Sequence, residues 1–194
     1  MKNNIPAQFP QSSQLEKELN YERYKRRYRR TLRSSTYALI TVAATAVLVA
    51  TLWMPVLQIY GASMTPTLQE GDIVVSVKEK DFQQGDVLAF YYGNKLLVKR
   101  CIASAGSWVD IKQDGTVYIN DQPLTEPYVD ELSYGNADIT FPYQVPEERI
   151  FLMGDHRSTS VDSRHALVGC IAEEYIVGKI VFRVWPLERF GPVD

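Results

Sequence analysis

The chain carries the uncharged and mostly apolar stretch TYALITVAATAVLVATLWM from Thr36 to Met54. As an α-helix, 19 residues at about 1.5 Å each cover about 28 Å, close to the hydrocarbon thickness of a bilayer. Tyr37 and Trp53 lie near its two ends, where aromatic side chains favour the membrane interface, and Pro55 marks an exit. The stretch predicts a single transmembrane helix, and we expect the anchor to occupy residues 34–57.

A cleaved signal peptide is the alternative interpretation of this stretch. Such peptides have a short basic leader and an apolar run of about 7–15 residues. Here a long charged leader of 33 residues precedes a longer apolar run. We therefore favour an uncleaved anchor in a plasma membrane, with the N-terminus in the cytoplasm and the residues after about 57 outside.

Charge is distributed unevenly on the two sides of the apolar stretch. Residues 1–33 hold nine Lys/Arg and three Asp/Glu, whereas residues 34–194 hold twelve and twenty, and nothing between Arg33 and Glu70 is charged. The basic run 21–30, interleaved with tyrosines, would suit nucleic acid as well as lipid. Its place beside an apolar stretch favours anionic headgroups and a cytoplasmic tail, so we expect a membrane and no nucleic acid as partner. The polar residues 1–20 predict disorder.

Beyond Glu70 the sequence changes to short β-branched and aromatic runs separated by turn signals. The runs are 73–77, 86–92, 95–102, 108–111, 116–119, 149–153 and 176–184. No segment has a long helical period, so residues 58–194 are expected to form one mainly β domain. Residues 121–148, which hold four prolines, are expected to be a long surface excursion with weak strands.

The two cysteines, Cys101 and Cys170, do not form a disulfide-rich framework or a zinc motif. They could pair in an oxidising compartment, but two buried free thiols are favoured. No glycine-rich phosphate loop is present.

Ser63 lies just after the apolar stretch, in Gly61-Ala62-Ser63-Met64-Thr65-Pro66-Thr67-Leu68, and a simple turn explains it equally well unless the chain supplies a base. A Ser-His-Asp triad with His156 or His165 is conceivable. Lysine is the other option: a free lysine is neutral in about one molecule in 2,500 at pH 7, but a pKa near 8 raises this to about one in ten. Lys99 fits, because a strand would place it between Leu97 and Cys101 on one face, although most strand lysines only reach for water.

A cluster of small polar and charged residues, from Gly154 to Arg164, follows the apolar run 149–153. Asp162 and Arg164 could form a charge-assisted pair within it. A well-capped loop explains the cluster as well as a functional site does. A calcium loop is weaker, because the acidic spacing does not match an EF-hand.

Together these stretches resemble the bacterial-type signal peptidase I family, membrane-bound serine proteases with a Ser-Lys dyad. The resemblance covers most of residues 36–187. Its motifs are Ser63-Met64-x-Pro66-Thr67-Leu68 with Gly71-Asp72, Gly85-Asp86-Val87, Lys99-Arg100, and Gly154-Asp155-x-Arg157-x-x-Ser160-x-Asp162-Ser163-Arg164. Each is weak alone, but their order behind a single anchor is specific.

The resemblance implies a β-rich catalytic domain of the signal peptidase or LexA-like type. Ser63 would be the nucleophile, Lys99 the general base, Ser160 an orienting group for the Lys99 ammonium, and Asp162 with Arg164 a brace. It implies no metal or organic cofactor. The substrates would be secretory preproteins emerging from the translocon, with small residues at positions −1 and −3, bound as an added strand.

The chain departs from the family pattern at one position. Some members carry a serine two residues before the nucleophile, where its hydroxyl completes the oxyanion hole, and here that position is Gly61. Losing one donor costs about 3 kcal/mol of transition-state stabilisation, so another donor is expected.

Two alternatives to a signal peptidase remain. A self-cleaving repressor with a similar dyad would be cytoplasmic, which the anchor opposes. A non-catalytic, membrane-tethered β domain that binds extended peptides or envelope partners would tolerate replacement of Ser63 and Lys99.

Overall fold

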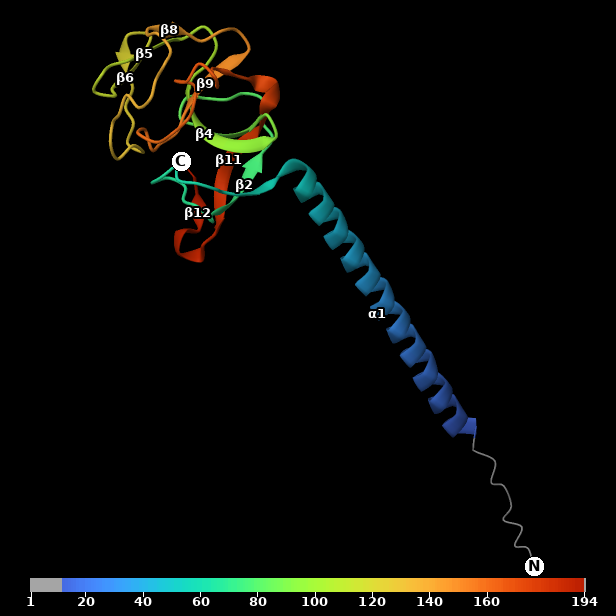
Figure 1. Cartoon of the computed structure of the whole chain (residues 1–194). Helices are drawn as coiled ribbons and strands as arrows, with labels where there is room; N and C mark the ends of the chain where they lie inside the picture. The colour runs from blue at the N-terminus through green and yellow to red at the C-terminus, as the bar shows by residue number, and fades with distance from the viewer. Residues whose placement is uncertain (1–11, 194) are drawn as a thin grey trace, which may run out of the picture. The chain divides into compact units, whose positions relative to one another are not determined.

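The computed structural model describes residues 12–193. The described chain is mainly β, with one long helix, α1 (Ser12–Trp53), before the strands (Figure 1). It divides into two compact units, one ending at Val49 and one beginning at Ala50. The expected fold class, an apolar N-terminal helix followed by a β-rich domain, is confirmed.

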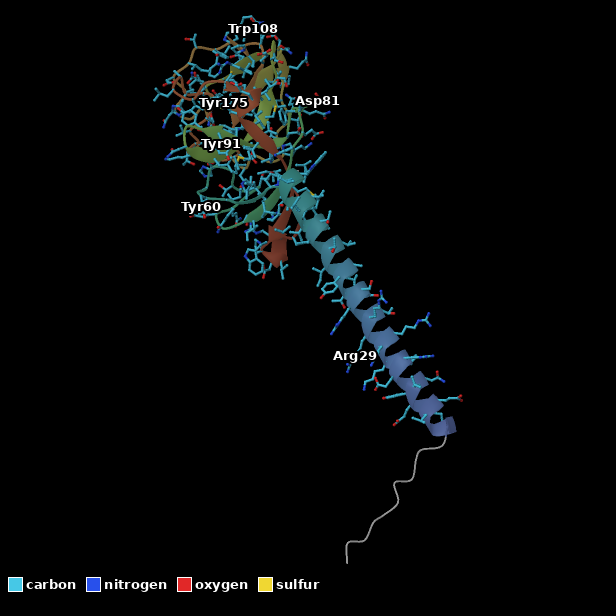
Figure 2. All side chains as sticks on the ribbon, turned by 90° about the vertical axis from the view of Figure 1, so that its right-hand side faces the viewer. Arg29, Tyr60, Asp81, Tyr91, Trp108 and Tyr175 are labelled. Carbon is cyan, nitrogen blue, oxygen red and sulfur yellow. The ribbon has the colours of Figure 1, made fainter. Side chains whose placement is uncertain are left out.

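Helix α1 is long and apolar enough, from Leu15 to Trp53, to cross a membrane, and its most apolar window is wholly unburied. Its side chains, Arg29 among them, point outward from the helix (Figure 2). The prediction of disorder over residues 1–20 is wrong for 12–20, where good helix formers such as Leu15 and Leu19 continue the helix. Residues 1–11 lie outside the described part. That residues 34–57 form the membrane anchor stays a prediction.

The helix ends where the sequence indicated. Trp53 is its last residue, and Pro55, which has no N–H to donate, precedes the first strand, β1 (Val56–Gln58). The C-terminal end of the expected anchor segment 34–57 is therefore extended rather than helical.

The larger sheet has eight antiparallel strands in the order β1-β2-β11-β3-β4-β9-β10, with β12 on β11. After β1 its members are β2 (Ile73–Val77), β3 (Val87–Tyr92), β4 (Lys95–Ala103), β9 (Arg149–Met153), β10 (Ile171–Ala172), β11 (Ile176–Trp185) and β12 (Gly191–Pro192). Two 3₁₀ helices flank β11: η1 (Glu173–Tyr175) and η2 (Leu187–Arg189).

The smaller sheet has the order β7-β6-β5-β8. Its strands are β5 (Trp108–Ile111), β6 (Val117–Ile119), β7 (Gln122–Pro123) and β8 (Tyr143–Gln144). Each of the seven expected runs beyond Glu70 contains a strand of one of the two sheets.

The segment 121–148 differs from the expected surface excursion. Its strands are weak, as expected, since β7 and β8 have two residues each. However, Val145 is buried in one core cluster together with Val109 and Phe151, and the Glu126 carboxylate is buried as well. The segment folds back because Tyr143 pairs with Val109 of β5.

A second core cluster lies under the residues that flank Ser63. It contains Met64, Leu68, Val74, Val87 and Ile180. Because Met64 directly follows Ser63 and is buried, this cluster fixes the position of the serine backbone.

Candidate active site

Ser63 is held in a short turn between β1 and β2. Leu68 N–H donates to the Met64 carbonyl at 2.8 Å, and Thr65 N–H donates to the Ala62 carbonyl at 3.1 Å. Gly61 starts the turn with φ +79°, a left-handed conformation that glycine adopts without strain. The turn leaves the Ser63 side chain half-buried beside β4.

Lys99 points from β4 toward Ser63. The Lys99 side chain is buried, and its Nζ lies 2.6 Å from Ser63 Oγ. The pattern-based expectation that Lys99 faces an apolar interior is therefore met, and the two candidate residues, 36 positions apart, lie within hydrogen-bonding distance.

The environment of Lys99 favours its neutral form. Burial lowers the pKa of Lys99 from 10.5 to about 8, and the positive charge of Arg164 acts in the same direction. The negative charges of Asp162 and Asp155 raise the pKa and oppose the shift only in part. At pH 7 about one molecule in ten then carries an unprotonated Lys99, enough for proton abstraction.

The loop after β9 holds Asp162 and Arg164 as a buried, two-bond pair. Arg164 Nε donates to Asp162 Oδ1 at 2.8 Å, and a second guanidinium nitrogen donates to Oδ2 at 2.9 Å. Gly154 N–H also donates to Asp162 Oδ2, at 3.0 Å. Burial acts to raise the pKa of Asp162, but the bonds and charge of Arg164 hold it below its ordinary value. The expected pairing is therefore present.

Two further arginine–carboxylate pairs, for which the sequence alone predicts no role, brace the site. Arg100 forms two hydrogen bonds to Asp155, at 2.9 and 2.8 Å, and stacks 3.8 Å above the Tyr128 ring. Arg157 forms two bonds to Glu126. Arg100, Asp155 and Arg157 belong to the motifs of the family resemblance, and that membership could have indicated a role for them. No local sequence pattern indicates a role for Glu126.

Ser160 does not make the expected hydrogen bond. It is buried, yet its Oγ has no hydrogen-bond partner among the described residues, Lys99 included. A Cβ added at Gly154 would lie 2.2 Å from Ser160 Oγ and 2.5 Å from the Ser63 carbonyl oxygen. Glycine at 154 therefore lets the loop approach Ser63 closely.

The histidine rings lie apart from Ser63 Oγ. The ring of His156 is exposed and contacts the Thr159 hydroxyl at 2.6 Å, although its backbone N–H donates to the Ser63 carbonyl at 3.1 Å. Within residues 12–193, neither the His156 ring nor the His165 ring is hydrogen-bonded to Ser63. The geometry favours Lys99 over a histidine as the partner of this serine.

The remaining candidate sites are not assembled in the described part of the chain. No group of three or more His, Cys, Asp or Glu side chains is placed there to hold a metal ion. Asp155 and Asp162 face arginines, which opposes the calcium-loop alternative. Cys101 and Cys170 are buried free thiols.

A groove of about 600 Å³ runs past Ser63 and Lys99. One wall is residues 56–60, from β1 onward, and the other is residues 95–99 of β4. β1 pairs only with β2, and β9 pairs with β4 only between Arg100 and Ala103. Within the described chain, both walls therefore present strand edges without a partner.

Comparisons with known proteins agree on one family. The model of the signal peptidase family, peptidase S26, matches residues 32–185. Signal peptidase IB of Staphylococcus aureus (strain COL) is 36% identical over 152 residues, which cover 68% of this chain and 78% of that protein. Thylakoidal processing peptidase 1, chloroplastic, of Arabidopsis thaliana is 35% identical over 166 residues, which cover 74% of this chain and 47% of that protein.

A crystal structure of a signal peptidase I from Enterococcus faecalis V583 is also similar. It is 28% identical, with a TM-score of 0.45, and the match covers 53% of this chain and 98% of that one. The family model alone covers well over half of the sequence. The chain therefore belongs to the signal peptidase family, peptidase S26.

Proposed function

We propose that Ser63 and Lys99 form the catalytic dyad with which this signal peptidase cleaves secretory preproteins. The observation that carries the proposal is the 2.6 Å separation of Ser63 Oγ and Lys99 Nζ. It is supported by the burial that lowers the pKa of Lys99 to about 8. A nucleophile beside a base with a lowered pKa is the arrangement that serine acylation needs.

The reaction proceeds in two steps. Neutral Lys99 takes the proton of Ser63 as Oγ bonds to the scissile carbonyl carbon, and the C–N bond then breaks as the proton passes to the leaving amine. Lys99 next takes a proton from water as that water attacks the acyl-enzyme, and it returns the proton to Ser63 Oγ as the C–O bond breaks and the signal peptide leaves. Asp162 and Arg164 hold the loop against the dyad. Ser160 Oγ is buried and has no hydrogen-bond partner among the described residues, so it is available to accept from the Lys99 ammonium that forms during the reaction.

The oxyanion hole uses the Ser63 backbone N–H. Gly61 offers no side-chain donor, and a Cβ placed there would meet nothing within 4 Å. That open space admits water as the second donor, the replacement that the missing hydroxyl requires.

The substrate binds as an extended strand between the walls of the groove. Unpaired backbone groups on both edges supply ladder hydrogen bonds, which recognise main chain independently of side-chain sequence. Helix α1 anchors the enzyme in the membrane. The basic run 21–30, in the N-terminal part of α1, is cytoplasmic and the β domain lies outside, where the signal peptide is cut as it emerges from the translocon.

A processing assay tests the dyad. Full-length enzyme in lipid vesicles is mixed with a purified precursor, and the mature product is counted. Ser63→Ala and Lys99→Ala should each lower kcat/KM by at least about 10³-fold. Lys112→Ala is the control, because Lys112 is an exposed lysine directly after β5 of the smaller sheet. Its kcat/KM should equal that of wild type.

Normal cleavage by either dyad variant would refute the mechanism and favour a peptide-binding domain without catalysis. A reporter fused after Asp194 tests the orientation separately. Reporter activity in the cytoplasm would contradict the proposed topology.

A further inference from the structure

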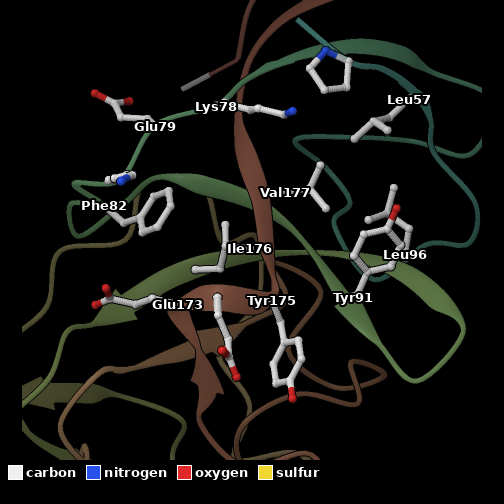
Figure 3. Close-up of a pocket in the computed structure, with 13 residues that line it drawn as sticks. Leu57, Lys78, Glu79, Phe82, Tyr91, Leu96, Glu173, Tyr175, Ile176 and Val177 are labelled. Carbon is white, nitrogen blue, oxygen red and sulfur yellow. The ribbon is translucent and has the colours of Figure 1, made fainter. Parts of the chain in front are cut away.

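A second, larger groove adjoins the one that holds Ser63. It has a volume of about 810 Å³. Its apolar and aromatic lining includes Leu57, Phe82, Tyr91, Leu96, Tyr175 and Val177. We refer to this space as the upstream groove. Figure 3 shows Val177 projecting from β11 toward the side that carries Leu57, Leu96 and Tyr91.

The two grooves are continuous. Leu57 and Leu96 line both of them, one from β1 and one from β4. Tyr91, the cross-strand partner of Leu96, extends the apolar lining beyond the catalytic groove. A chain lying along the edges of β1 and β4 therefore passes from Ser63 directly into the upstream groove.

The direction of that chain follows from where β1 starts. Pro55 lines the upstream groove and comes two positions after the end of α1. Along the chain, the end of the groove near Pro55 is therefore the one that follows the proposed membrane anchor most directly. The part of a precursor that is still in the membrane is the signal peptide, so its residues before the cleaved bond lie toward this end.

Spacing sets which residues reach the upstream groove. Leu96 is three positions from Lys99, or about 10 Å along a strand at about 3.3 Å per residue. If residue −1 lies at Lys99, the residue beside Leu96 is about the fourth before the bond. Residues from about −5 upstream then enter the larger groove. In signal peptides an apolar segment of about 7–15 residues comes before the cleavage site.

We propose that the upstream groove binds the C-terminal end of the signal peptide's apolar segment, in addition to the contacts that the substrate makes beside the dyad. This inference rests on the proposed function, because its occupant is the substrate of Ser63 and Lys99. It explains two tyrosines that stay exposed within the described residues 12–193, Tyr91 at 56% and Tyr175 at 52% exposure.

The charged residues of the groove are compatible with an apolar occupant. They come from two segments, 78–80 and 173–174, and are exposed. Lys78 points into the space in Figure 3, and its long side chain can keep the ammonium in water while its stem covers apolar surface.

Two substrates with the same cleavage site test the inference. One is a precursor with its whole apolar segment, and the other is a short peptide that begins at residue −4. The double variant Tyr91→Ser/Tyr175→Ser and the variant Val177→Lys are compared with wild type. Trp108→Ser serves as the matched control, since Trp108 is an exposed aromatic residue of the smaller sheet.

Both groove variants should raise KM for the long precursor about tenfold, the factor expected when one apolar side chain loses its buried contact. Their kcat/KM for the short peptide should equal that of wild type. Trp108→Ser should change neither value. Unchanged KM for the long precursor in both variants would overturn the proposal while leaving the dyad intact.

Other results identify other occupants. The groove variants and a further variant, Lys78→Gln, could instead cleave the short and the long substrate equally slowly, and only when the enzyme is in vesicles. That result would mean that the groove holds lipid, and it would refute the proposal. Cleavage of neither substrate by wild type would instead refute the proposed function itself, whatever the groove variants did.

Discussion

Arg164 and Lys99 are two buried cations of one site in opposite electrostatic settings. Arg164 forms two hydrogen bonds with the Asp162 carboxylate. The hydrogen bond of the Lys99 side chain in the described chain is instead to the neutral Ser63 hydroxyl. A paired charge is stable when buried, but a cation without a carboxylate partner loses its proton more readily. The paired charges of the loop therefore persist, whereas the positive charge of Lys99 on β4 is easily lost.

The largest effect is expected when Lys99 is given a permanent charge. Lys99→Arg keeps a long cationic side chain, but guanidinium stays protonated at any usable pH. Cleavage should fall by about 10³-fold or more, with little change in fold. Precursor processing and far-UV circular dichroism measure the two effects. Substantial activity would show that the charged form is sufficient.

The next largest effect concerns the paired cation. Arg164→Met leaves the Asp162 carboxylate buried without its partner and should lower the free energy of unfolding by about 3–5 kcal/mol. Urea denaturation of the β domain in the full chain measures it. Lys112→Ala, which removes an exposed ion pair with Asp110, should change stability little. Similar values for both variants would mean that burial of the Arg164 pair is unimportant.

A smaller effect is expected at the contact between the loop and the serine. Gly154→Ala places a methyl group against Ser160 Oγ and the Ser63 carbonyl, which should cost about 1–3 kcal/mol of stability. It should also lower kcat more than it raises KM, because the dyad is displaced. Gly191→Ala is the control, since a Cβ there meets nothing within 4 Å. Equal kcat in the two variants would contradict the role of the close approach.

The smallest effect is a pair of shifts in pH dependence. Since Lys99 must be neutral to act, wild-type kcat/KM should rise with pH through about 8. Asp162 raises the pKa of Lys99 and Arg164 lowers it. Asp162→Asn should therefore move the profile to lower pH, and Arg164→Met should move it to higher pH. Shifts in the same direction would mean that general destabilisation causes them.

The sequence predicted local features better than long-range contacts. The strands at 73–77, 108–111 and 149–153 were predicted with the bounds that the structure has, because β-branched runs between turn residues indicate them. Lys99 was found from the two-residue alternation of β4 together with the family resemblance. The free Cys101 and Cys170 were likewise favoured from composition.

Contacts between distant segments were not predictable in this way. The Glu126 carboxylate reaches Arg157 across 31 positions, and no short pattern reports such a distance. The same holds for Val145, whose burial depends on the pairing of Tyr143 with Val109. Helix formation over 12–20 was not predicted, because a polar composition is as typical of disorder as of an exposed helix, and only the propensity of residues such as Leu15 and Leu19 favours the helix.

The brevity of β1 limits when cleavage can take place. Three residues after a proline offer only a few backbone groups, so a finished sheet of another protein gains little by docking there. A flexible chain can still enter. If the first residues of the mature protein have already joined a folded domain, they cannot supply that flexible chain. Cleavage must therefore come before these residues fold, or the cleavage site must be followed by a flexible segment. The rate at which a protein folds after export would then compete with its maturation.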